Sequence, residues 1–197
     1  MALLTIEERE QYFKDLGLGE YNKANILKLQ KKYFIRKKDQ DGIYGSDTDK
    51  LLRHVWNVLV WLPKNSGRTN FEPEEFKCEC GGKYCTGDPT YMKQHQLALI
   101  QEIRTFFGKP MIVTCGMRCS TYNKKLNGSI ANSKHLSGEA TDYYIAGVTD
   151  NLANRKKSIK VIKKLKYHSY SYGNGINSLG QKIYAPYMGN ALHTDSK

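Results

Sequence analysis

The spacing of apolar and polar positions in the first sixty residues predicts three short helices. The first begins near Thr5, and the second, at 26–34, repeats its apolar positions with the 3.6-residue period of a helix. The third begins at Ser46 or Asp47, either of which can cap it. Its apolar face is predicted to comprise Leu51, Leu52, Val55, Leu59 and Val60.

Turn residues interrupt this pattern twice. Residues 39–45 are rich in Asp and Gly, and both Gly42 and Gly45 can adopt the positive φ of a tight turn. Residues 63–69 combine Pro, Asn, Ser and Gly without an apolar rhythm, which is typical of a linker. We therefore expect a small helical domain, a linker and a larger second domain, with boundaries at 1–62, 63–69 and 70–197.

The second domain is predicted to mix helix and strand. Residues 91–107 suit a helix with one buried side, which Gly108 and Pro110 would end. Apolar runs favour strands at 111–115, 141–145 and 190–194. The predicted fold class is α+β.

Composition and the N-terminus set outer limits on the function. The 197 residues are 40% hydrophobic, and no apolar run approaches the roughly 18 residues of a membrane span. The first ten residues lack the basic start and the apolar segment of a signal peptide. We expect synthesis in the cytoplasm without a signal peptide.

The net charge of +12 is concentrated after residue 62. Residues 1–62 carry eleven Lys and Arg against nine Asp and Glu, whereas the remainder carries twenty against ten. This charge favours a polyanionic partner, such as nucleic acid, anionic lipid or a phosphate-bearing cell wall. Residues 155–166 form a basic amphipathic pattern that could attract such a polymer or simply present a solvated face. Nucleic acid is disfavoured, because no zinc-finger, helix-turn-helix or aromatic RNA-binding signature accompanies the charge.

Two imidazoles and one carboxylate indicate an open zinc site. His135 and Asp142 belong to the run Ser-Lys-His-Leu-Ser-Gly-Glu-Ala-Thr-Asp at 133–142, and His193 lies near the C-terminus. Gly138 permits the turn that would point the first two at one centre. Three such ligands leave the fourth tetrahedral position of Zn²⁺ to water, as catalytic sites require. The remaining histidines are expected to be ordinary surface or core residues: His54, His95 and His168.

The five cysteines allow several interpretations. Three lie close together and two follow later: Cys78, Cys80, Cys85, Cys115 and Cys119. The odd number, without a signal peptide, favours reduced thiols. A second, structural metal, disulfides and free thiols all stay open, while a nucleophilic role is disfavoured because the histidines serve the metal.

The N-terminal part resembles the peptidoglycan-binding domain found on many cell-wall hydrolases. Leu29 and Gln30, followed by Asp-Gly-Ile-Tyr-Gly at 41–45 and by Thr48, match the signature of that family. The resemblance implies a three-helix bundle and bacterial peptidoglycan as partner. The alternative is that the pentapeptide is only a turn between helices.

The second domain resembles the zinc D-Ala-D-Ala carboxypeptidase and L-Ala-D-Glu endopeptidase family. The resemblance rests on three blocks in the family's order, at 114–123, 133–142 and 192–195, and on Phe-Glu-Pro-Glu-Glu-Phe at 71–76. It implies a LAS-type fold, shared with lysostaphin-type peptidases, around a central antiparallel sheet.

The same resemblance assigns roles to individual residues. His135, Asp142 and His193 would bind Zn²⁺, and Arg118 would contact a carboxylate or carbonyl of the substrate. The remaining candidates for substrate binding are Asn123 and Ser133. The alternatives are a structural salt bridge for Arg118 and a turn cap for Ser133.

The general base is a separate question. Many relatives place an acid three residues before the last ligand, where this chain has Asn190. A family branch with an Asp two residues after that ligand suggests Asp195 instead, with Glu139 as the alternative.

A wall-binding domain joined to such a peptidase resembles a phage endolysin or a bacterial autolysin. We therefore expect a monomeric zinc peptidase that cuts an amide bond in peptidoglycan after release from the cytoplasm, as an endopeptidase. Anionic wall polymers are a second expected partner. The alternatives are a D-Ala-D-Ala carboxypeptidase and a catalytically dead wall-binding protein.

Overall fold

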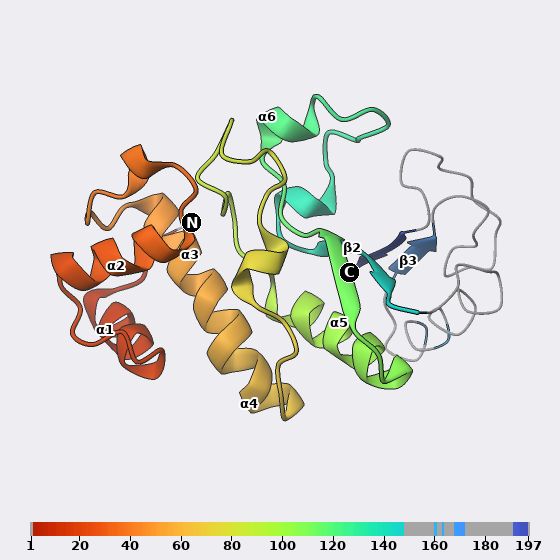
Figure 1. Ribbon diagram of the computed structural model, residues 1–197, viewed down its shortest axis with the longest axis horizontal. Coiled ribbons are helices and arrows are strands. Elements are labelled where there is room, and N and C mark those ends of the chain that lie inside the picture. Colours follow the sequence, from red (N-terminus) through yellow and green to blue (C-terminus); the bar gives the residue numbers. More distant parts are fainter. Residues whose placement is uncertain (1, 148–159, 161–162, 164–167, 172–190, 197) are drawn as a thin grey trace.

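The computed structural model describes residues 2–147, 160, 163, 168–171 and 191–196 (Figure 1). The predicted basic helix at 155–166 lies outside the described residues except for Lys160 and Lys163, which are exposed. Asn190 also lies outside them. None of the helices in the described segments is long and apolar enough to cross a membrane.

The three helices predicted at the N-terminus are present as α1 (Ile6–Asp15), α2 (Lys23–Tyr33) and α3 (Ser46–Trp56). Thr5 and Glu8 form a capping box at the start of α1, in which each side chain accepts a hydrogen bond from the other residue's backbone. A short 3₁₀ helix, η1 (Lys37–Asp39), precedes the turn before α3. The three helices bury one apolar cluster: Leu4, Phe13, Ile26, Leu29, Tyr33, Phe34, Leu51, Leu52 and Val55.

The turn before α3 departs from prediction in two details. Gly42 has the expected positive φ of 72°, but Gly45 has a φ of −113°. Gly45 is itself the N-terminal cap of α3, so Ser46 and Asp47 lie inside the helix instead of capping it. The side chain of Gln30 stabilises the turn, because its Oε1 accepts a hydrogen bond of 2.7 Å from the backbone N–H of Gly42.

The helix that begins with α3 continues further than predicted. It passes through a π-helical turn, η2 (Asn57–Trp61), into α4 (Leu62–Ser66), and Gly67 ends it with a φ of 72°. The first residues of the predicted linker are therefore helical. The helix extends into this segment because of tertiary packing. Val58 and Leu62 are fully buried in a second apolar cluster, distinct from that of the N-terminal helices, and pack this stretch against α5.

The second cluster lies between this long helix, α5 (Gln94–Phe107) and an antiparallel sheet (Figure 1). Gly108 ends α5 in the left-handed conformation, as predicted. The sheet contains β1 (Met111–Cys115), β2 (Ala140–Ile145), β3 (His168–Ser171) and β4 (Leu192–Asp195), in the order β1-β2-β4-β3. This mixture of helix and antiparallel strand agrees with the predicted α+β class. Strand β3 was not predicted.

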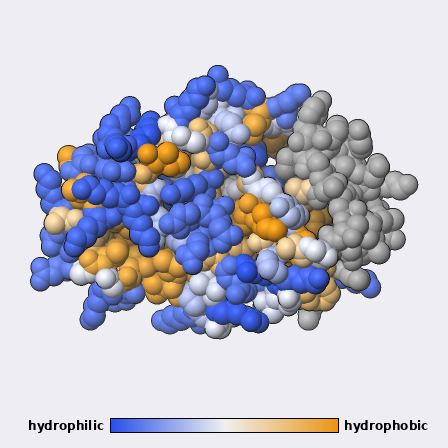
Figure 2. All heavy atoms as spheres, viewed as in Figure 1, coloured by the Kyte–Doolittle hydropathy of each residue, from blue (hydrophilic) through white to orange (hydrophobic). Residues whose placement is uncertain are grey.

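Three short helical segments complete the described structure: η3 (Pro73–Phe76), α6 (Ser120–Asn123) and η4 (Lys134–Leu136). Hydrophilic residues predominate on the face shown in Figure 2, with smaller apolar groups between them. The division into domains at 1–62 and 70–197 stays a prediction.

Candidate metal centre

The sheet register brings two of the predicted metal ligands side by side. Asp142 on β2 pairs with His193 on β4, and on its other side β2 pairs Asp142 with Cys115 of β1. His135 arrives from η4, immediately before β2. Residues distant in sequence therefore meet at the centre of three adjacent strands.

Glycine is required at the turn between His135 and Asp142. Gly138 has a φ of 72°, and a Cβ at this position would lie 2.0 Å from the carbonyl oxygen of Tyr91. The carbonyl of Gly138 in turn accepts a hydrogen bond of 2.9 Å from the backbone N–H of Lys93. The turn is thus pressed against the segment before α5, which supports the role predicted for Gly138.

The three predicted ligands converge in a buried cluster. His193 Nδ1 lies 2.6 Å from Asp142 Oδ1, and His135 Nε2 lies 3.3 Å from Asp142 Oδ2. The two imidazole rings are 5.1 Å apart between centroids. Asp142 is completely buried, and both histidines are less than a tenth exposed.

The hydrogen bonds of His135 indicate which of its nitrogens can bind a metal. His135 Nδ1 lies 2.7 Å from the carbonyl oxygen of Gly116, which can only accept, so Nδ1 carries the proton. The other ring nitrogen, Nε2, lies on the side of Asp142. Such a second bond to a backbone carbonyl is typical of zinc-bound histidine.

The surroundings of Asp142 Oδ2 indicate whether these residues can hold a metal ion. This oxygen is buried and accepts no hydrogen bond within the described part of the chain, and His135 Nε2 lies 3.3 Å from it. A buried carboxylate oxygen without a hydrogen-bond partner, next to an imidazole nitrogen, is a suitable position for a cation. Two ligands of one tetrahedral zinc ion, each bound at about 2.0–2.1 Å, are about 3.4 Å apart. The distance between these two atoms therefore fits a shared zinc ion.

The buried charges shift two pKa values in opposite directions. Burial raises the pKa of the Asp142 carboxyl, but His135 and His193 outweigh it and hold that pKa below its ordinary value. Burial lowers the pKa of His193, but its hydrogen bond to Asp142 and its proximity to Asp195 outweigh burial and raise the pKa to about 9. Asp142 and Asp195 thus favour the protonated form of His193.

Arg118 lies at the same centre. Its Nη2 is 3.8 Å from Asp142 Oδ2 and 3.1 Å from the sulfur of Cys115, and its Nη1 donates to Asn123 Oδ1 at 3.2 Å. Its Nε is buried without a hydrogen-bond partner in the described structure. Asn123 therefore orients the guanidinium. Ser133 is buried just before η4 but its side chain does not cap that helix, which removes the capping alternative.

The two candidate bases have different surroundings. Asp195 Oδ2 lies 3.6 Å from His193 Nε2, so its carboxylate borders the cluster. Glu139 instead accepts from Lys134 Nζ at 2.9 Å and from Ser137 Oγ at 2.7 Å. Of these two carboxylates, Asp195 is therefore the one that lies beside the His and Asp cluster.

A family model described as Peptidase M15 matches residues 69–173, more than half of the chain. The chain belongs to the Peptidase M15 family. Neither the curated proteins nor the solved structures contain a significant match. The matched region of this M15 chain includes Arg118, His135 and Asp142, whereas His193 and Asp195 follow it. M15 peptidases are zinc enzymes, and the matched region of this chain carries two of the three predicted ligands.

The structure corrects the grouping of the cysteines in this M15 chain. Cys115 does not join the other four; its sulfur lies 3.6 Å from His135 Nδ1, and its thiol, His135 and Asp142 form a potential metal-binding group. Burial raises the pKa of the Cys115 thiol to about 12, which favours the neutral thiol. Sequence reasoning missed the roles of Cys115 and of the Gly116 carbonyl, since both depend on the pairing of β1 with β2.

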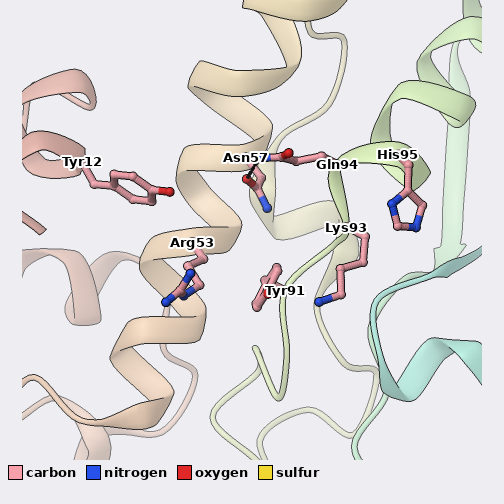
Figure 3. A pocket seen from close by; sticks show the side chains of 7 residues that line it. All are labelled: Tyr12, Arg53, Asn57, Tyr91, Lys93, Gln94 and His95. Carbon is pink, nitrogen blue, oxygen red and sulfur yellow. Dashed lines mark hydrogen bonds between the residues drawn. The ribbon is translucent and has the colours of Figure 1, made fainter. Parts of the chain in front are cut away.

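A separate pocket of about 250 Å³ lies between the long helix and the segment before α5 (Figure 3). None of the predicted site residues lines it. Its lining combines aromatic and cationic side chains with amides: Tyr12, Arg53, Asn57, Tyr91, Lys93, Gln94 and His95. Elsewhere in the chain, His54, which was predicted to be an ordinary surface or core residue, is completely buried.

Proposed function

We propose that this M15 protein is a zinc-dependent peptidoglycan peptidase that hydrolyses an amide bond of the stem peptide or crosslink. The observation that carries the proposal is the buried Asp142 Oδ2, which accepts no hydrogen bond in the described part of the chain and lies 3.3 Å from His135 Nε2, a spacing that fits two ligands of one zinc ion. Membership of the M15 family supports the reaction class.

The residues proposed to hold the zinc ion are His135, Asp142 and His193. A zinc ion in such a site supplies a bound water of lowered pKa and polarises the scissile carbonyl. The Gly116 carbonyl holds the His135 ring in the tautomer that leaves Nε2 available. His193 must turn one nitrogen from its carboxylate partners toward the ligand position, which requires loss of its extra proton.

The proposed base is Asp195. Its carboxylate lies beside the cluster and can take the proton released by the attacking water and deliver it to the leaving amine. Glu139 is less suited because Lys134 and Ser137 already bind its carboxylate.

Arg118 is proposed to bind the substrate. Within the described residues the Nε–H of the buried guanidinium has no partner, so it can donate to a carboxylate or to the oxyanion that develops at the scissile carbonyl. Its contacts with Asn123 and Cys115 fix the plane of the guanidinium. Ser133, buried beside η4, is the further proposed contact.

We also propose that the N-terminal helices form a three-helix wall-binding domain and that the protein acts as an endolysin-like enzyme after release. The residues of its signature contact one another: Gln30 Nε2 donates to Thr48 Oγ1 and to the Ile43 carbonyl, each at 3.0 Å. The signature therefore maintains the turn, while the exposed side chain of Ile43 is available to a partner.

The test uses purified cell walls. We expect loss of turbidity and release of amino groups without new reducing sugar ends, and both should stop when a chelator removes the metal. Lysis that survives complete metal removal would refute the zinc mechanism. Mass spectrometry of the muropeptides separates the bonds: cleaved crosslinks or stems support an endopeptidase, whereas loss of only terminal D-Ala indicates a carboxypeptidase. An inactive protein that still sediments with walls would indicate a wall-binding role alone.

A further inference from the structure

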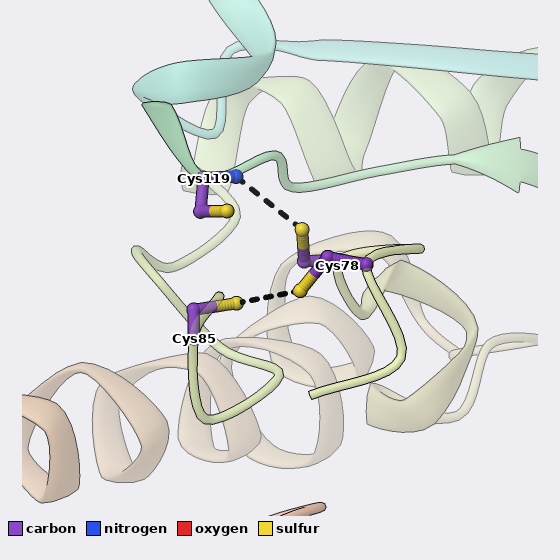
Figure 4. Close-up of side chains that lie close together, drawn as sticks. Cys78, Cys85 and Cys119 are labelled. Atoms are coloured by element: carbon purple, nitrogen blue, oxygen red, sulfur yellow. Dashed lines mark hydrogen bonds between the residues drawn. The ribbon is translucent and has the colours of Figure 1, made fainter. Parts of the chain in front are cut away.

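Four of the five cysteines meet at one point, away from the His and Asp cluster. The sulfur atoms of Cys78, Cys80, Cys85 and Cys119 all lie within 4.8 Å of one another, and Cys80 and Cys85 are 3.4 Å apart. Figure 4 shows the side chains of Cys78, Cys85 and Cys119 facing a common centre. We propose that these four thiols bind one zinc ion in a closed, structural site.

The geometry agrees with a tetrahedral tetrathiolate. With zinc–sulfur bonds of about 2.3 Å, the sulfurs of such a site are about 3.8 Å apart. The separation of 3.4 Å between Cys80 and Cys85 is close to that value, and the limit of 4.8 Å on the remaining pairs is compatible with it. Disulfides would instead divide the sulfurs into two bonded pairs at about 2.05 Å, and all four are free thiols here.

The polar surroundings suit thiolates. The backbone N–H of Cys119 donates to the sulfur of Cys78 at 3.3 Å, and the N–H of Tyr122 donates to the sulfur of Cys119 at 3.4 Å. A zinc ion with four thiolates carries a net charge of −2, which nearby cations offset. The candidates are Lys83 and Lys125, whose ammonium groups lie over the ring of Tyr84, a residue that packs against the cluster.

The cluster joins two segments that are distant in the chain. Three of its thiols come from the loop before α5, and Cys119 comes from the segment between β1 and α6. The loop is also attached to the N-terminal helices, because the Ile35 N–H donates to the Thr86 carbonyl at 2.9 Å and a Cβ on Gly82 would lie 2.8 Å from the Ile35 side chain. A zinc ion here would crosslink the loop to the segment that carries Arg118.

The position of Arg118 gives this crosslink a functional consequence. Arg118 immediately precedes Cys119, and its backbone N–H donates to the His135 carbonyl at 3.0 Å. The zinc ion would therefore hold the guanidinium in place from outside the reaction centre. This consequence rests on the proposed function, whereas binding of the metal by the four thiols does not.

Metal analysis of the full-length protein, purified under reducing conditions, tests the proposal. We expect two zinc ions per chain, one of which is released by a thiol-modifying mercurial. Cobalt substitution of the wild type should produce the near-ultraviolet charge-transfer bands of thiolate ligands and the intense visible bands of a tetrahedral site. This spectrum needs no variant, so misfolding of a variant cannot obscure it.

Variants then assign each metal to its site. The double variant Cys80→Ser/Cys85→Ser should lose the thiolate bands and one equivalent of zinc, while Cys115→Ser should keep both the bands and that equivalent. His135→Ala/Asp142→Ala should also keep the thiolate-bound metal, so failure of the proposed peptidase site is distinguishable. Absence of thiolate bands at full cobalt loading, or two disulfides in the native protein by mass spectrometry, would overturn the proposal.

Discussion

The buried His54 provides a test of the packing between the N-terminal helices and the rest of the chain. Its side chain extends from α3, and its Nε2 lies 2.9 Å from the Pro73 carbonyl while its Nδ1 accepts from the Met92 N–H at 3.4 Å. Because the carbonyl can only accept, Nε2 carries the proton and Nδ1 is the acceptor. A second proton on Nδ1 would face the N–H of Met92 with no acceptor.

The size of the expected loss of folding stability follows from the pKa of His54. Complete burial lowers the pKa of His54 from 6.5 to about 4 in the folded protein. The unfolded chain therefore binds a proton between these two pH values while the folded chain does not, so acid favours unfolding. The stabilisation is complete above pH 6.5 and is lost as the pH falls to about 4. At about 1.4 kcal/mol per pH unit, protonation of His54 should lower the free energy of unfolding by about 3 kcal/mol over that interval.

Urea unfolding of the wild type and of His54→Gln, at neutral pH and near pH 4, measures this effect. Glutamine can still donate to the Pro73 carbonyl but does not titrate. The wild type should be more stable at neutral pH, and its advantage should shrink by about 3 kcal/mol on acidification. Other titrating groups, including the buried Asp88, are shared by both proteins and cancel in the difference. An advantage that is independent of pH would refute the reasoning.

Three further substitutions test the metal centre. Gly138→Ala should destabilise the fold by about 2–4 kcal/mol in thermal or urea unfolding. The new Cβ would clash with the Tyr91 carbonyl, and alanine would be strained at the positive φ of this position. An unchanged unfolding midpoint would contradict this prediction. Asp195→Asn should lower kcat by about 10²–10⁴-fold without loss of zinc. Glu139→Gln is the matched control, and an equal loss of kcat in both variants would argue against Asp195 as the base. Arg118→Lys should raise KM or lower kcat for wall fragments roughly tenfold or more while leaving the metal content unchanged. The reason is that an ammonium group cannot form the two parallel hydrogen bonds of a guanidinium. Full activity of this variant would exclude Arg118 as a substrate-binding residue.

The sequence by itself determined the local structure of this protein. The helical periods of α1, α2, α3 and α5 and the glycine end of α5 at Gly108 follow from interactions within a few residues, so a linear pattern suffices to predict them. The motif at 133–142 likewise predicted the turn at Gly138, because positive φ is a property that glycine tolerates in any context.

The tertiary structure decided where these elements meet. Burial of Val58 and Leu62 extended the helix of α3 into the predicted linker, although the local composition favours a break. The pairing of β2 with β1 and β4 placed Cys115 and His193 on either side of Asp142 and separated Cys115 from the other four cysteines. Strand register and the contacts of the Gly116 carbonyl depend on packing of the whole chain, and no sequence spacing encodes such long-range distances directly.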